Sequence, residues 1–164
     1  MSSTIGTSLG AAVVMTPEQL RAHYQGHRRV TRRMIEAFPN DKLFTFSVGN
    51  MRPFAELVLE FIRMGLPVVR GVATGEWTTD DIGDPRSKSD LLRIWDEHTE
   101  EIDRIWPAIP PHRWQEKDSA FGAWPGIGIN LLMYSIDNEI HHRGQAYAYL
   151  RALGIAPPAF YDRS

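Results

Sequence analysis

The sequence predicts an all-α protein, a four-helix bundle, from three observations. Four long segments repeat apolar residues at spacings of three and four, polar or proline-containing connections separate them, and no convincing pair of alternating strand segments is present. With 164 residues, 43% hydrophobic and 23% charged, the chain has the size and composition of one globular domain. We therefore expect a flexible N-terminal tail over residues 1–15 and a single domain over residues 16–164.

The first helix is expected over residues 17–37, because its start carries several helix signals. Thr16 supplies a hydroxyl cap, Pro17 suits the first helical position, and Gln19 can close a capping box. The stretch 42–51 has some β-branched and aromatic residues, but nothing convincing to pair with. We interpret it as a loop.

Proline and glycine delimit the second and third helices. The second begins at Pro53, and the glycine and proline within residues 65–67 are expected to bend or end it. The third is capped by Ser87 or Ser89 and ends before Pro107.

The fourth helix is expected over about residues 127–153, after a loop rich in tryptophan and glycine that runs through Pro125. Gly154 stops it. Gly144 lies in its interior, where glycine costs roughly 1 kcal/mol relative to alanine, so we expect a close packing contact there.

Charge and composition exclude several classes of function. Eighteen Lys and Arg against twenty Asp and Glu give a net charge of −2, which argues against nucleic-acid binding. The chain has no cysteine, so disulfides and thiolate chemistry of its own are excluded. No apolar stretch approaches the ~20 residues that span a bilayer, so we predict no membrane association and a cytoplasmic protein.

Polar groups gather in the middle of the fourth predicted helix. Asn138 and His142 are four residues apart and share a face, and Tyr134 and Gln145 lie along the same strip. A strip of polar groups with apolar flanks suits a recessed site better than a fully solvated surface.

Two other groups of residues receive structural interpretations. His23 and His27 also stand four apart, but no third ligand is evident, so we expect a core-edge or solvated pair. The arginines within residues 28–33 are expected to form a solvated face toward the acidic third helix.

The run from Glu139 to Gln145, EIHHRGQ, followed by residues 149–155, YLRALGI, resembles the last helix of the DinB-like (DinB/YfiT) family. The stretch 51–57, MRPFAEL, is similar to the entry of that family's second helix. The resemblance implies a bundle in up-down-down-up order, often dimeric, so a homodimer is expected.

The resemblance also implies a site for a divalent metal, which the family binds with three histidines. The corresponding positions here are Glu60, Asn138 and His142, so only one of the three remains histidine. The ion would be Zn, Ni, Mn or Fe, and the oxygen-rich set shifts the preference toward the harder ions. A metal-free hydrogen bond between His142 and Glu60 is an equal alternative, and Arg63 is another candidate partner for Glu60.

Characterised members of the family include metal-dependent transferases that use low-molecular-weight thiols. The resemblance thus implies a metal-dependent transferase or hydrolase acting on a small-molecule substrate, with Tyr134 or Gln145 contacting that substrate. A metal-free module that binds a small ligand or a protein is the second hypothesis. A structural dimer without any site is the third.

Overall fold

The computed structural model describes residues 13–164, which form four long helices and one short hairpin. Residues 1–12, most of the predicted tail, lie outside the described part. The helices are α1 (Pro17–Ala37), α2 (Phe54–Thr74), α3 (Lys88–Ile105) and α4 (Gly128–Ala152). The prediction of a mostly helical protein is therefore confirmed.

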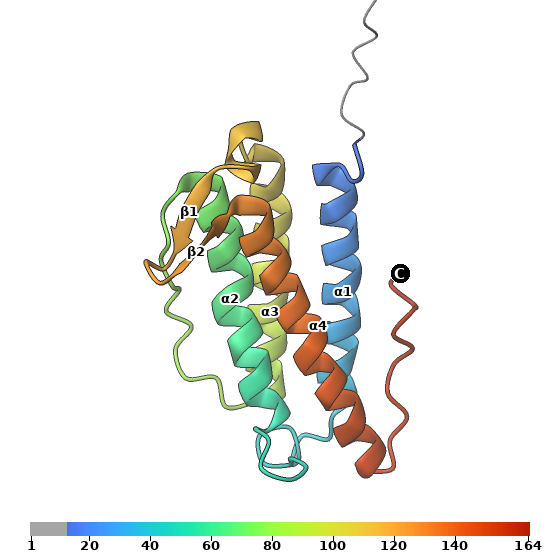
Figure 1. Cartoon of the computed structure of the whole chain (residues 1–164). Coiled ribbons are helices and arrows are strands. Elements are labelled where there is room, and N and C mark those ends of the chain that lie inside the picture. Colours follow the sequence, from blue (N-terminus) through green and yellow to red (C-terminus); the bar gives the residue numbers. More distant parts are fainter. Residues whose placement is uncertain (1–12) are drawn as a thin grey trace, which may run out of the picture.

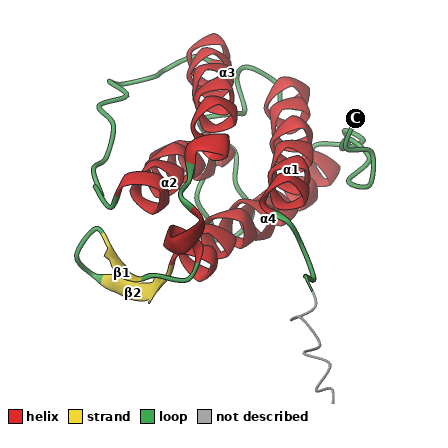
Figure 2. Ribbon diagram, turned by 90° about the horizontal axis from the view of Figure 1, so that it is seen from above, coloured by secondary structure: helices red, strands yellow, loops and turns green. Residues whose placement is uncertain are grey.

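The helices lie alongside one another (Figure 1). α2 packs against α3 and α4, and α1 packs against the same two helices, so each helix has two helical neighbours. Seen along the helices, α1 and α2 are separated by the other pair (Figure 2). Within residues 13–164, no helix is long and apolar enough to cross a membrane.

Local sequence signals fix the starts of α1 and α3. At α1, Thr16 accepts from the Gln19 amide at 3.2 Å and Gln19 accepts from the Thr16 amide at 2.9 Å, which confirms the predicted capping box. At α3, Ser87 and Asp90 form the same reciprocal arrangement. Backbone groups that a helix start would leave unpaired are thereby satisfied.

The second helix is longer than the sequence suggested, because α2 continues through Pro67 to Thr74. Proline removes one backbone donor from a helix. The buried residues that follow, Val68, Val69 and Val72, keep this end of the helix in the core, and Gly75 ends it with φ of 81°.

The class all-α is incomplete, because the region predicted as a loop rich in tryptophan and glycine contains a β-hairpin. Strand β1 (Lys117–Ala120) pairs antiparallel with β2 (Trp124–Ile127), and Lys117 lies opposite Ile127. Short 3-10 turns at Trp106–Ala108 and Pro111–Trp114 lead into it. The hairpin packs against the beginning of α4 and thus sets where that helix starts.

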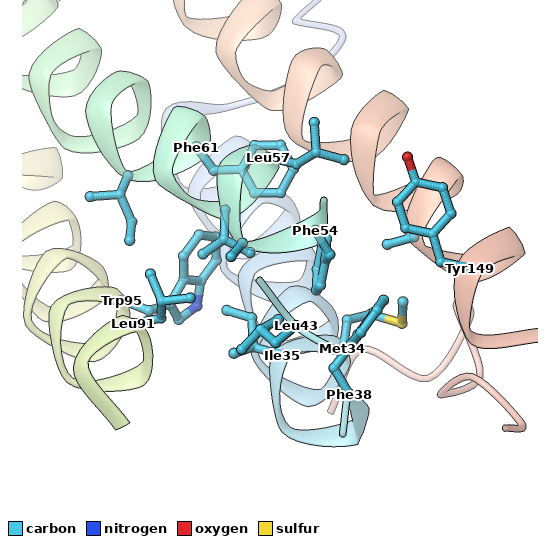
Figure 3. Packing of buried hydrophobic residues seen from close by; sticks show 14 of the residues in the cluster. Met34, Ile35, Phe38, Leu43, Phe54, Leu57, Phe61, Leu91, Trp95 and Tyr149 are labelled. Atoms are coloured by element: carbon cyan, nitrogen blue, oxygen red, sulfur yellow. The ribbon is translucent and has the colours of Figure 1, made fainter. Parts of the chain in front are cut away.

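Aromatic and aliphatic side chains from all four helices fill the core (Figure 3). Phe38 and Phe54 stack with ring centroids 4.6 Å apart and join α1 to the beginning of α2. Tyr149 of α4 is fully buried, and its hydroxyl donates to the backbone oxygen of Arg52 at 3.0 Å. This contact fixes the chain just before α2, where the candidate site begins.

Candidate functional site

Glu60 of α2 is the centre of a polar cluster that α2 and α4 build together. The Nδ2 of Asn138 donates to Glu60 Oε1 at 2.9 Å, and Nε2 of His142 lies 3.3 Å from the same oxygen. The structure thus brings together the three residues that the sequence nominated as metal ligands. The Glu60 and His142 side chains are 26% and 16% exposed, so the cluster is accessible from solvent.

Arg52 completes this cluster, although no motif or spacing in the sequence predicts a role for it. Its Nη2 lies 2.6 Å from Glu60 Oε2, although the two residues are eight positions apart. The hydrogen bond from Tyr149 and the next residue, Pro53, hold the backbone of Arg52 in place. From there its side chain extends along α2 to Glu60. Spacing rules for residues within one helix cannot find such a pair, because Arg52 precedes the helix.

Arg63, the other arginine considered as a partner, forms no ion pair with Glu60 in the described chain. Burial opposes ionisation of Glu60, but the hydrogen bonds from Asn138 and Arg52 and the charges of Arg52 and His142 outweigh it. They hold the pKa of Glu60 below its ordinary value. The carboxylate at the centre of the cluster is therefore anionic at neutral pH.

Gln145 contacts His142, the residue predicted to lie beside it on the helix. Gln145 Oε1 lies 3.2 Å from His142 Nδ1, and its Nε2 lies 3.4 Å from His141 Nε2. A carboxylate oxygen only accepts, so a proton on Nδ1 of His142 serves the contact with Gln145, and a proton on Nε2 serves the contact with Glu60. Gln145 therefore orients the imidazole.

Tyr134 stands apart from the cluster, with 65% of its surface exposed. Over residues 13–164, no hydrogen bond joins it to Glu60, Asn138 or His142. Its predicted contact with substrate stays a prediction.

The donor atoms of the cluster do not suit a resident metal ion. Asn138 turns its amide NH2 toward Glu60, whereas a ligand would present its oxygen. Arg52 already occupies the second oxygen of Glu60. Among the residues that the structure describes, no group of three or more His, Cys, Asp or Glu side chains is placed to hold a metal.

A second polar group, the buried charge cluster, joins α1 to α4 inside the protein. It consists of His27, Arg28, Thr31, Glu139 and Arg143, all at most 4% exposed. Thr31 donates to Glu139 at 2.5 Å, and Arg143 donates to Thr31 at 3.0 Å and to the backbone oxygen of His27 at 2.9 Å.

The position of Arg28 corrects one expectation from the sequence. Arg28 is buried against the ring of Trp95, 3.8 Å from its centroid, and does not belong to a solvated face. His27 is buried beside Arg143. Arg32, in contrast, does pair with the acidic face of α3, through Asp96 at 2.8 Å.

Residues 86–164, which contain α3, the hairpin and α4, match the model of the DinB family. The match covers just under half of the chain and, with the DinB-like structural neighbours, confirms the resemblance seen in the sequence.

Two Bacillus proteins are similar to the chain. The uncharacterized protein YjoA of Bacillus subtilis strain 168 is 24% identical over 149 residues, which are 88% of this chain and 96% of YjoA. The crystal structure of YjoA, a DinB-like protein, superposes with a TM-score of 0.73 at 20% identity, covering 89% of this chain and 99% of YjoA. A DinB-like protein from Bacillus cereus ATCC 10987 gives 0.70 at 18% identity, with 88% and 97% covered.

A more distant structural neighbour is a mutant of a mycothiol-dependent maleylpyruvate isomerase. Its TM-score is 0.61 at 12% sequence identity, and the match covers 80% of this chain and 61% of the isomerase chain. At this identity the likeness shows a shared fold alone.

Proposed function

We propose that this protein is a small-ligand-binding module with the DinB fold whose site works without a resident metal ion. The cluster of Glu60, Asn138 and His142 would bind the ligand, on a four-helix bundle in the up-down-down-up order. The single observation that carries the proposal is the ion pair between Arg52 and Glu60 at 2.6 Å. A guanidinium is a permanent cation and supplies the positive charge that the Glu60 carboxylate requires.

The charge at the cluster also fits this interpretation. Glu60 is an anion, and Arg52 neutralises it without any external ion. A metal ion would have to displace the guanidinium and turn the Asn138 amide, losing two hydrogen bonds to Glu60. Within residues 13–164, the other donors of the Arg52 guanidinium have no recorded partner and can meet a polar ligand.

Elemental mass spectrometry on untagged protein tests the proposal. The protein is expressed with Mn, Fe, Ni and Zn each offered in the medium, next to a His142→Ala control. We expect no stoichiometric ion in either protein. About one ion per chain in the unmodified protein, lost in His142→Ala, would contradict the metal-free site.

Thiol chemistry is the second candidate, supported by the fold shared with a mycothiol-dependent enzyme and by the contact between His142 and Glu60. In such a reaction, the tautomer of His142 with its proton on Nδ1 would accept the thiol proton at Nε2 in place of the contact with Glu60. The sulfur would bond to an electrophilic carbon as the leaving group departs. Arg52 would stabilise the developing thiolate through its positive charge. This role would make the protein a transferase for a low-molecular-weight thiol.

An assay with free cysteine and an activated aryl halide tests the thiol role by following the thioether product. We expect a rate above the uncatalysed reaction that falls to background in His142→Ala. Substitution of the exposed His112 by Gln is the matched control and keeps the rate. Equal rates in all three proteins would leave ligand binding as the remaining function.

A further inference from the structure

A pocket of about 450 Å³ lies beside the cluster, on the outer side of α2, and is called the α2 pocket here. Its volume falls within the range of sites for small molecules. The lining residues are Arg52, Glu56, Leu59, Glu60, Arg63 and Met64. Leu59 and Met64 are half-buried, and the other four carry charge.

The four charges of the α2 pocket are unequally satisfied. Arg52 and Glu60 neutralise each other. Glu56 and Arg63 are both exposed, and neither has an ion-pair partner within 4 Å in the described part of the chain. The pocket therefore offers one unpaired anion and one unpaired cation to a ligand.

The distance between these two groups sets the length of a ligand that meets both. Glu56 and Arg63 are seven residues apart on α2, which places them on one face with a rise of about 10.5 Å. An extended peptide covers about 3.3–3.6 Å per residue, so three residues match this rise. Glu60 lies between the two on the same face.

We propose that the α2 pocket binds a zwitterionic peptide of about three residues, with its ammonium group on Glu56 and its carboxylate on Arg63. The proposal rests on the proposed function, because it names the class of ligand for the same site. A guanidinium can receive the carboxylate through two parallel hydrogen bonds. The middle residue of the peptide lies over Glu60, which lines the pocket between the two ends.

NMR titration of the full chain with triglycine tests the proposal, with amide shifts followed along α2. N-acetyltriglycine lacks the ammonium, triglycine amide lacks the carboxylate, and glycine is too short to reach both residues. We expect triglycine to shift amides around Glu56, Glu60 and Arg63. Each capped peptide and glycine should bind about two- to fivefold more weakly, because one partly exposed ion pair is lost.

Matched variants locate the two ends of the peptide. Arg63→Gln should weaken the binding of triglycine about two- to fivefold but leave the binding of triglycine amide unchanged. Glu56→Gln should weaken the binding of triglycine by the same factor but leave the binding of N-acetyltriglycine unchanged. Arg93→Gln, on the exposed surface of α3, is the control and should bind like the unmodified protein. Equal binding of triglycine by all variants, or no shifts on α2, would overturn the proposal.

A failure of peptide binding can be distinguished from a failure of the metal-free site. Metal content is measured on the same samples, and a stoichiometric ion contradicts the metal-free site irrespective of peptide binding. Absence of both the ion and the shifts overturns only the peptide.

Discussion

Arg143 of α4 donates from Nη2 to Nδ1 of His27 on α1 across 2.8 Å. A guanidinium can only donate, so this ring nitrogen must be unprotonated. Burial first, and then the positive charge of Arg143, lower the pKa of His27 to about 3. The contact between α1 and α4 therefore requires a neutral histidine.

This requirement predicts a loss of stability in mild acid. In the unfolded chain His27 binds a proton near pH 6.5, whereas in the folded protein it stays neutral down to about pH 3. The contribution of neutral His27 to the free energy of unfolding is complete above pH 6.5. It is lost as the pH falls toward 3, at up to about 1.4 kcal/mol per pH unit. Urea unfolding at pH 7, 6 and 5 measures this slope.

The variant His27→Gln keeps an acceptor for Arg143 but cannot titrate, so its slope should be smaller. Burial also lowers the pKa values of His23 and His98, so part of the pH dependence of stability remains in this variant. His112→Gln changes an exposed ring and should leave the slope as it was. An unchanged slope in His27→Gln would show that this histidine is not the acid-sensitive group.

Glu139 is the one carboxylate of the buried charge cluster and faces two guanidiniums. Arg28 and Arg143 lie 3.8 and 3.7 Å from its oxygens, and burial raises its pKa against their opposing charges. Glu139→Ala leaves both cations without a counter-charge, and we expect a loss of about 3–5 kcal/mol in the free energy of unfolding.

Urea unfolding measures the loss, and Glu139→Gln provides a variant that retains an acceptor for Thr31 and should lose less. The matched control is Glu36→Ala, which removes an exposed partner of Arg32 and should cost less than about 1 kcal/mol. If Glu139→Ala cost no more than Glu36→Ala, the cluster would not stabilise the fold.

Gly144 and Gly71 should respond in opposite directions to alanine. The expected packing contact at Gly144 is wrong, because within the described structure nothing lies within 4 Å of the position that a Cβ would take. Gly144→Ala should therefore stabilise α4 by about 1 kcal/mol. At Gly71 a Cβ would lie 2.3 Å from the Trp77 ring, so Gly71→Ala should cost about 1–3 kcal/mol. Thermal unfolding compares the two, and the same sign for both would refute this account.

Removing Arg52 should uncover a metal site only when Asn138 also becomes a ligand. The double variant Arg52→Ala with Asn138→His offers two imidazoles and the Glu60 carboxylate, a set that suits divalent transition metals. We expect it to bind Ni at least tenfold more tightly than Asn138→His alone, because the guanidinium no longer competes for Glu60. Isothermal titration calorimetry measures both affinities, and equal values would mean that Arg52 does not block the ion.

Helix positions could be predicted from the sequence because their signals are local. The cap formed by Thr16 and Gln19 and the periodic apolar residues gave bounds for α1 that match the structure. The hairpin could not be predicted in this way, since each strand has four residues and β2 contains Pro125. Its pairing depends on contacts with α4 that a local pattern does not contain.

For the site, helical spacing identified Asn138 and His142, and the resemblance added Glu60. Neither could identify Arg52, whose side chain reaches Glu60 from before the helix. The burial of Arg28 could not be predicted from the sequence either, because its partners Trp95, Thr99 and Glu139 belong to α3 and α4. Long-range charge pairing is a tertiary property that composition and periodicity do not encode.

The buried charge cluster has a consequence for protein synthesis. Arg28 and Thr31 leave the ribosome more than 100 residues before Glu139, which is the carboxylate they face. Until then a partial structure of α1, α2 and α3 would have to bury Arg28 without that counter-charge, at a cost of several kcal/mol. Stable folding of the nascent chain therefore waits for α4.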